Sequence, residues 1–166
     1  RALATIGAAV DDLAGAPAMR ARAWGTRGLV HRERGEFGPA IADFDRAVAY
    51  LRGAGDDLGL QRALINRAVT RIDTFDIGRA VTDLREADAI AESAHPAARG
   101  LIAANLGHAA SVGGDIPEAL RQYRRAEDIL RAEGAQLGST LADRGALLIR
   151  VGLADEAFAD LSYALQ

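Results

Sequence analysis

The 166-residue chain contains no cysteine and no lysine, and only 5% of its residues are aromatic. Without cysteine it can form no disulfide bond, offer no thiol nucleophile and supply no thiolate to a metal ion. The same absence fits a reducing compartment, so we expect a cytoplasmic protein. Apolar runs are too short to span a bilayer, and no charged start leads into the apolar core of a signal peptide.

A surplus of basic charge is also missing. The formal net charge is −3 and the pI is about 5.6, so binding to nucleic acid or to a membrane surface has little electrostatic support. Apolar residues make up 49% of the chain and charged residues 26%, which is typical of a folded soluble domain. The chain begins with Arg1 rather than methionine, which indicates a processed product or a piece of a longer array.

A repeating pattern fills most of the sequence, at intervals of 38 to 40 residues. The segments that align are GEFGPAIADFDRAV (35–48), FDIGRAVTDLREAD (75–88), GDIPEALRQYRRAE (114–127) and GLADEAFADLSYAL (152–165). Each carries an alanine, a large side chain four residues later and another alanine three residues after that. A small residue lies twelve positions before each first alanine: Gly28, Ala68, Gly107 and Gly145.

This spacing predicts an all-α protein built from helical hairpins. Apolar residues recur with the period of a helix and nowhere alternate as in a strand. Small residues at fixed places on both helices let the two backbones approach closely, and the large side chains fill the space beside that contact. We therefore predict a solenoid of helical hairpins.

The sequence also indicates where the turns within the hairpins lie. Glycines that can adopt a left-handed conformation end three of the first helices: Gly35, Gly114 and Gly152. Asp115 and Glu118 have the spacing of a capping box at the start of the next helix. Phe75 takes the glycine place in the second repeat, so we expect a different turn there. Residues added between repeats are expected in the loops GAGDDLG (53–59) and SAHPAA (93–98).

The chain resembles the tetratricopeptide (TPR) repeat family over nearly its whole length. The matching positions in the first repeat are Trp24, Gly28, Gly35, Phe37, Ala40, Phe44 and Ala47. The resemblance implies a right-handed superhelix of about three and a half hairpins plus a leading helix, within one array fragment. The expected parts are the second helix of a truncated repeat (1–15), repeats at 21–54, 61–94 and 100–133, and a truncated repeat at 138–166.

Arginine-rich and alanine-rich phrases such as LINRAVTRIDTFDIGRAVTDLREA resemble the TPR regions of actinobacterial TPR–CHAT proteins. Those proteins carry a caspase-like CHAT domain elsewhere in the chain, so the resemblance implies a non-catalytic recognition arm. Similar TPR regions occur in large bacterial transcriptional regulators. A ligand-sensing arm of such a regulator is therefore an alternative, and a stand-alone adaptor is another.

No catalytic, metal or cofactor site is expected. The glycine-rich segment 53–59 lacks the preceding strand that a phosphate-binding loop requires. Glu92 and His95 form a single E-x-x-H, whereas helical di-metal sites need two such motifs. His31 is expected to be a half-buried packing residue, and His108 has no obvious acid to orient it as a general base.

Arginine precedes the small residue of the first helix in three repeats, and aspartate lies sixteen positions later. These positions predict structural ion pairs between the helices of a hairpin: Arg27 with Asp43, Arg67 with Asp83, and Arg144 with Asp160. In the third repeat the two places hold Leu106 and Gln122, so charge is lost from both together.

First helices of TPR repeats line a concave groove, so the resemblance implies a protein or peptide partner there, possibly the parent protein's own effector domain. The oligomeric state is left open. The expected groove residues are Arg22, Leu29, Arg32, Arg62, Asn66, Val69, Asp73, Leu101, Asn105, His108, Val112, Asp143, Ala146 and Arg150. Asn66 and Asn105 could bind either a ligand backbone or the neighbouring repeat. The basic residues of the chaperone-binding carboxylate clamp are absent, since Gly25, Leu101 and Asn105 hold their places.

Overall fold

The computed structural model describes residues 16–91 and 96–164, and all regular structure in these ranges is helical. The helices are α2 (Pro17–Glu33), α3 (Phe37–Ala54), α4 (Asp57–Asp73), α5 (Ile77–Ala91), α6 (Pro96–Gly113), α7 (Ile116–Ala132), α8 (Gly138–Arg150) and α9 (Ala154–Ala164). The all-helical fold is confirmed. The expected leading helix at 1–15 and the pair Glu92 and His95 lie outside the described residues.

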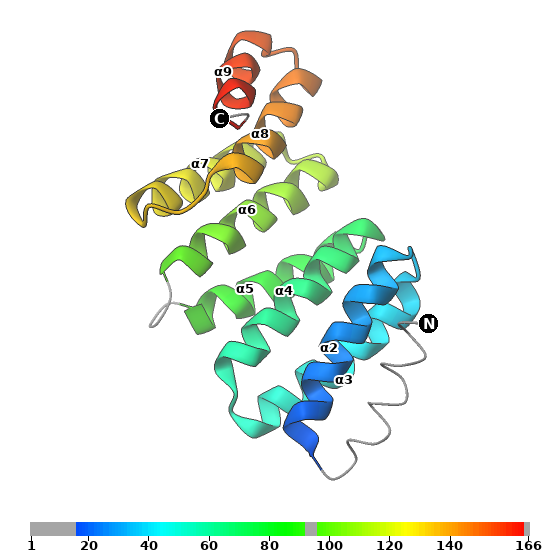
Figure 1. The fold of residues 1–166 in the computed structure, drawn as a ribbon. Coiled ribbons are helices and arrows are strands. Elements are labelled where there is room, and N and C mark those ends of the chain that lie inside the picture. The colour runs from blue at the N-terminus through cyan, green and yellow to red at the C-terminus, as the bar shows by residue number, and fades with distance from the viewer. Residues whose placement is uncertain (1–15, 92–95, 165–166) are drawn as a thin grey trace. The chain divides into compact units, whose positions relative to one another are not determined.

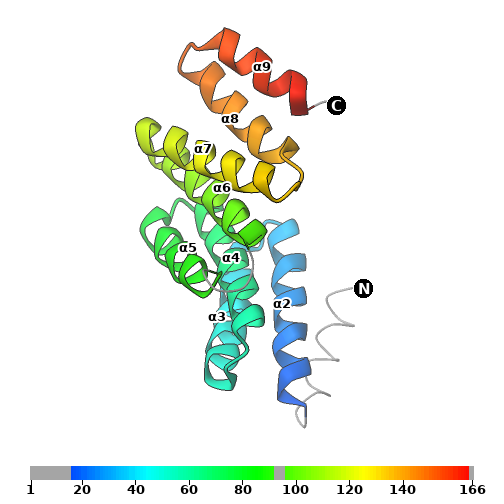
Figure 2. The same cartoon turned by 90° about the vertical axis from the view of Figure 1, so that its left-hand side faces the viewer.

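The chain forms two compact units, Arg1–Ile90 and Ala91–Gln166, with the boundary at the last residue of α5. In the first unit α2 packs against α3, and α3 packs against α4 (Figure 1). In the second unit α6 packs against α7, α7 against α8 and α8 against α9; Figure 2 shows α6 and α7 side by side. Consecutive helices therefore pair as the repeat predicts, and each unit is described by itself below.

The small residues of the first helices lie against large side chains of the second helices, as predicted. A Cβ atom added to Gly28 would lie 2.8 Å from Cε1 of Phe44, and one added to Gly107 would lie 2.9 Å from Cδ1 of Tyr123. At Gly145 the added atom would lie 2.9 Å from Cγ of Leu161. These separations are below normal carbon–carbon contact, so a larger residue would force the facing side chain or the helices to shift.

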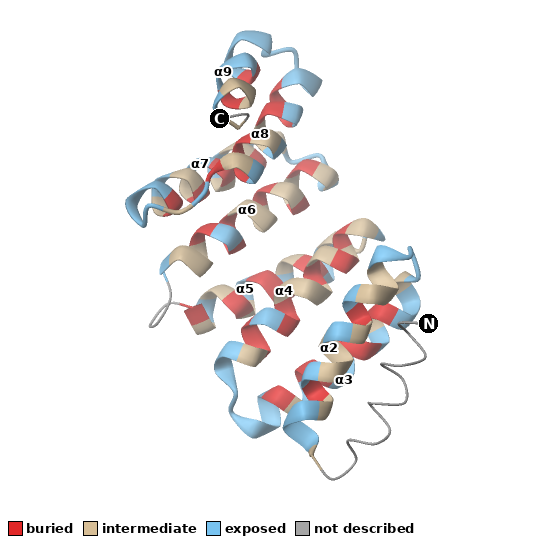
Figure 3. Cartoon of the chain, in the orientation of Figure 1, coloured by how far each residue is buried: buried red, intermediate tan, exposed pale blue. Residues whose placement is uncertain are grey.

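Buried residues gather on the helix faces that meet within each unit, as the red segments in Figure 3 show. The alanines of the repeat pattern are completely enclosed, with exposed fractions of 0 to 1% at Ala40, Ala80, Ala119 and Ala157. The large residues four positions later are equally buried in the first three repeats. The repeat pattern thus marks the core directly.

The four hairpins within the described residues, α2–α3, α4–α5, α6–α7 and α8–α9, use the same turn. Gly35, Gly114 and Gly152 have φ angles of 73°, 84° and 81°, and Phe75 has a φ of 61° at the equivalent place. The amide of Phe75 donates to the carbonyl of Ile72 at 2.9 Å, and the amide of the following residue donates to the carbonyl five positions back, as in the other three turns. The expectation of a different turn at Phe75 was therefore wrong. Packing of the helices on both sides imposes the turn, although a side chain disfavours it.

Two other details of the connections differ from expectation. The segment 53–59 is mostly helix, because α3 continues to Ala54 and α4 begins at Asp57, so the connection is only Gly55 and Asp56. Asp56 caps α4 by accepting a hydrogen bond from the amide of Gly59 at 2.9 Å. Half of the expected capping box at α7 is present: Asp115 accepts from the amide of Glu118 at 3.0 Å, while its own amide donates to Ala110.

No helix among the described residues is long and apolar enough to cross a membrane.

Replacing Phe75 with glycine is expected to stabilise the first unit by about 0.5–1 kcal/mol. A side chain in the left-handed region costs about 1–2 kcal/mol, and the extra freedom of glycine in the unfolded chain offsets part of the gain. The single tryptophan, Trp24, lies in α2 and reports on this unit. Urea unfolding followed by its fluorescence should show a higher midpoint for F75G. A lower midpoint would mean that the exposed ring contributes more than the strain costs.

The contact between Gly28 and Phe44 should behave as a coupled pair. Gly28→Ala is expected to cost about 1–3 kcal/mol by overpacking against the ring. The second repeat has Ala68 and Leu84 at the equivalent positions. The free energy of unfolding of the double variant G28A/F44L should therefore be about 1 kcal/mol higher than the two single effects added together predict. A double-mutant cycle of urea unfolding measures this coupling. Strict additivity would show that the two residues do not share one space.

Candidate functional site

The three predicted Arg–Asp pairs are present in the structure, each with two parallel hydrogen bonds. Arg27 donates from Nε and Nη2 to Asp43 at 2.6 and 2.7 Å. Arg67 donates in the same way to Asp83 at 2.9 and 2.7 Å. Both distances from Arg144 to Asp160 are 2.7 Å. This bidentate geometry fixes the crossing angle of the two helices and the position of one helix along the axis of the other.

The pairs belong to larger networks that the spacing did not predict. Each of the nearly buried carboxylates of Asp43 and Asp83 also accepts from a second arginine, at 2.9 Å from Arg46 and at 2.6 Å from Arg71. Arg67 also donates to Asp45 of α3 at 2.7 Å, which links the second repeat to the first.

Arg144 in the second unit makes the corresponding link. It donates to Glu127 of α7 at 2.6 Å while holding Asp160 of α9. The hydrogen bond to Asp160 raises the pKa of the Arg144 guanidinium above its usual value, against the opposing effect of burial, and Glu127 adds to the increase. The guanidinium therefore stays charged and joins three helices.

The third repeat lacks the pair, and its interior shows the consequence. Gln122 donates from Nε2 to Glu118 at 2.8 Å, but its own carbonyl oxygen is buried without a hydrogen-bond partner. Leu106 stands where the other repeats have arginine and cannot donate to that oxygen. The exchange of Arg and Asp for Leu and Gln removes the charges but leaves one polar group unsatisfied.

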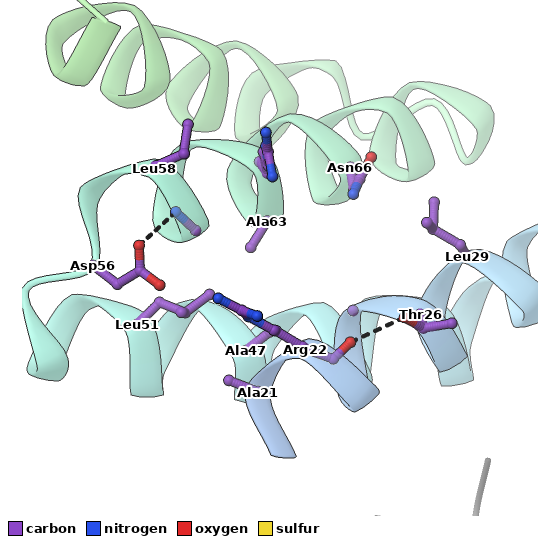
Figure 4. Close-up of a pocket in the computed structure, with 13 residues that line it drawn as sticks. Ala21, Arg22, Thr26, Leu29, Ala47, Leu51, Asp56, Leu58, Ala63 and Asn66 are labelled. Atoms are coloured by element: carbon purple, nitrogen blue, oxygen red, sulfur yellow. Dashed lines mark hydrogen bonds between the residues drawn. The ribbon is translucent and has the colours of Figure 1, made fainter. Parts of the chain in front are cut away.

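An open groove of about 520 Å³ lies between α2 and α4 in the first unit, with Ala47 and Leu51 of α3 beneath it. Four predicted partner contacts line it: Arg22, Leu29, Arg62 and Asn66. Figure 4 shows the side chains of Leu29 and Asn66 pointing toward each other from opposite walls. The groove is therefore the place in the first unit where the sequence-predicted residues meet.

An ion pair joins the C-terminal ends of α2 and α4. Arg32 of α2 donates from Nε to Asp73 of α4 at 2.7 Å, and both side chains are partly exposed. These two predicted groove residues thus pair with each other across the two walls. Val69 lies between this pair and Asn66 along α4 and is half-buried.

Asn66 and Asn105 differ in what their amides do. The side chain of Asn66 forms no hydrogen bond to any described residue. Asn105 donates from Nδ2 to the carbonyl of Leu101 in its own helix at 3.0 Å, so neither of the two expected partners holds it. Of these two asparagines, Asn66 is the one whose side-chain amide has no partner among the described residues.

The second unit brings three of its polar groove residues, His108, Asp143 and Arg150, into electrostatic contact around Asp143 and the buried Tyr123. Burial raises the pKa of the Asp143 carboxyl, and the charge of His108 partly opposes this. His108 thus acts on Asp143 through its charge, but no hydrogen bond or ion pair joins these two described side chains. Burial also raises the pKa of the Tyr123 hydroxyl, Asp143 raises it further, and Arg150 opposes the increase.

No reaction follows from this cluster. Arg150 donates to both the carbonyl and the hydroxyl oxygen of Ser111, at 3.0 and 2.9 Å, so that hydroxyl is engaged by a cation and not by a base. His31, expected to be a packing residue, is partly buried but places its Nδ1 2.5 Å from Glu36. The described residues contain no group of three or more possible metal ligands.

The chain matches no family model and no curated protein. Among solved structures it is similar to the crystal structure of BtubC (BKLC) from P. vanneervenii, with a TM-score of 0.76 and 18% sequence identity. The likeness covers 90% of this chain and 63% of that chain, so the present chain spans less than two thirds of that structure. At this identity the likeness shows the fold alone, a helical repeat array.

Introducing the missing pair should reveal its contribution. In the double variant L106R/Q122D the new guanidinium and carboxylate should pair as Arg27 and Asp43 do, whereas Q122D alone leaves a partly buried carboxylate uncompensated. We expect the free energy of unfolding of the double variant to be about 1–3 kcal/mol higher than the sum of the two single effects predicts. A cycle of urea unfolding followed by circular dichroism measures this, and additive effects would contradict the equivalence of the four hairpins.

Proposed function

We propose that this chain is a non-catalytic scaffold of the TPR type that recognises a protein or peptide segment. The groove between α2 and α4 carries the proposal, because its walls present Leu29 at 38% exposure and the uncommitted amide of Asn66. An apolar contact beside a free amide suits a polypeptide, which offers both side chains and backbone carbonyls.

The wider context is proposed from the sequence resemblance. The arginine-rich and alanine-rich repeats support a cytoplasmic recognition arm of a TPR–CHAT-type protein from an actinobacterium, whose partner could be the parent's own effector domain. A ligand-sensing arm of a transcriptional regulator and a stand-alone adaptor are the alternatives. The reading frame around this segment separates them: a caspase-like His and Cys domain supports the first, and a DNA-binding domain supports the second.

Filling the groove should weaken recognition. Thr26 is exposed and lines the groove, and its hydroxyl donates to the carbonyl four residues back. Thr82 of α5 is also exposed and makes the same type of hydrogen bond, but it does not line the groove. Peptides selected from a random decapeptide library on the immobilised protein should bind the T82W variant and lose at least about tenfold in affinity for T26W, because the indole occupies their place.

Circular dichroism should confirm that both variants fold. Selected peptides that bind T26W as tightly as wild type would place recognition elsewhere on the surface. If the selection yields no binding peptide, the proposed function is contradicted.

A further inference from the structure

The groove between α2 and α4 contains two arginines that nothing in the described chain neutralises. Arg22 and Arg62 line it from opposite walls, and neither guanidinium has a hydrogen-bond or ion-pair partner among the described residues. Most other arginines of this unit are committed. Those with carboxylate partners are Arg27, Arg32, Arg46, Arg52, Arg67, Arg71 and Arg79.

One acidic residue lies among the described residues that line the groove, and it does not offset both charges. Asp56 lies at the start of α4, where its carboxylate accepts the hydrogen bond from Gly59. Two guanidiniums around one acid leave the groove with a positive charge, in a chain whose net charge is −3. Bringing like charges to one groove is unfavourable unless an anion lies between them, so a ligand carboxylate would relieve the repulsion.

The order of residues along the two walls is the same. Arg22, Thr26 and Leu29 occupy one stripe of α2 at steps of four and three residues, and Arg62, Asn66 and Val69 repeat that order on α4. Such steps place side chains on one face of a helix. The α2 wall therefore runs from a cationic residue, through a polar one, to the apolar Leu29, while on α4 the groove lining ends at Asn66, one step before Val69.

The length of this stripe sets the spacing of a ligand. Seven residues of helix rise about 10 Å, which an extended chain covers in about three residues. An acidic side chain held between the arginines would therefore place a residue about three positions away beside Leu29.

We infer that the groove recognises an extended acidic segment in which a Glu or Asp lies about three residues from an aliphatic side chain. The inference rests on the proposed function, whose recognition site it specifies. The second unit provides a contrast: the places equivalent to Arg22 and Arg62 hold Leu101 and Ser139, so the acidic preference belongs to the first unit.

The composition of peptides from a random decapeptide library tests this inference. Acidic residues about three positions from Leu, Ile or Val should be enriched on wild-type protein. The enrichment should disappear on R22Q/R62Q. It should persist on R85Q, because Arg85 is an exposed arginine of α5 outside the groove. A fluorescein-labelled, C-terminally amidated decapeptide with one Glu and one Leu at this spacing should bind about tenfold more tightly than its Gln counterpart at low salt.

Three results would overturn the inference. If peptides are selected and blocked by T26W but contain no excess of acidic residues, the groove function stands and the acidic ligand is wrong. An acidic preference that persists in R22Q/R62Q would place the cationic contact elsewhere. If no peptide is selected, the proposed function fails together with its ligand.

Discussion

The close contact between a small residue on one helix and a large side chain on the next is the constraint on which each hairpin depends. At Gly28 the Phe44 ring lies 2.8 Å from the place where a Cβ atom would be, so the absence of a side chain lets the backbones approach closely. The Arg27–Asp43 pair lies one residue before each of these two positions and therefore meets in the same register. Packing and charge thus specify one arrangement of the two helices, and a shift along either helix would disrupt both.

The buried carboxylates make the hairpins specific more than they make them stable. Removing a carboxylate from water costs several kcal/mol, which an ion pair repays only with good geometry and further hydrogen bonds. Asp83 meets both conditions, since Arg67 holds it with two bonds and Arg71 supplies a third. The third repeat shows that the hairpin forms without charge, because Tyr123 still packs against Gly107 while Gln122 leaves one oxygen unpaired.

Contacts within a repeat could be predicted from the sequence because they recur at one spacing: sixteen residues separate the members of each intra-hairpin pair. Contacts between repeats do not recur in this way. Arg67 reaches Asp45 across 22 residues, whereas Arg144 reaches Glu127 across 17. The turn at Phe75 was misjudged because local preference favoured glycine, while the packing of two helices determined the conformation.

The division between core and groove explains how one framework can present different chemistry. Hairpin packing uses the small residues, alanines and Arg–Asp pairs. The groove of the first unit shares Ala47 with that core as part of its floor, but its polar contacts come from other positions on α2 and α4. A change at Arg22 or Arg62 therefore alters the groove without touching the contact between Gly28 and Phe44. The second unit illustrates this, since it keeps the close contact at Gly107 while its first helix presents Leu101 in place of an arginine. Recognition can thus differ between repeats whose packing is the same.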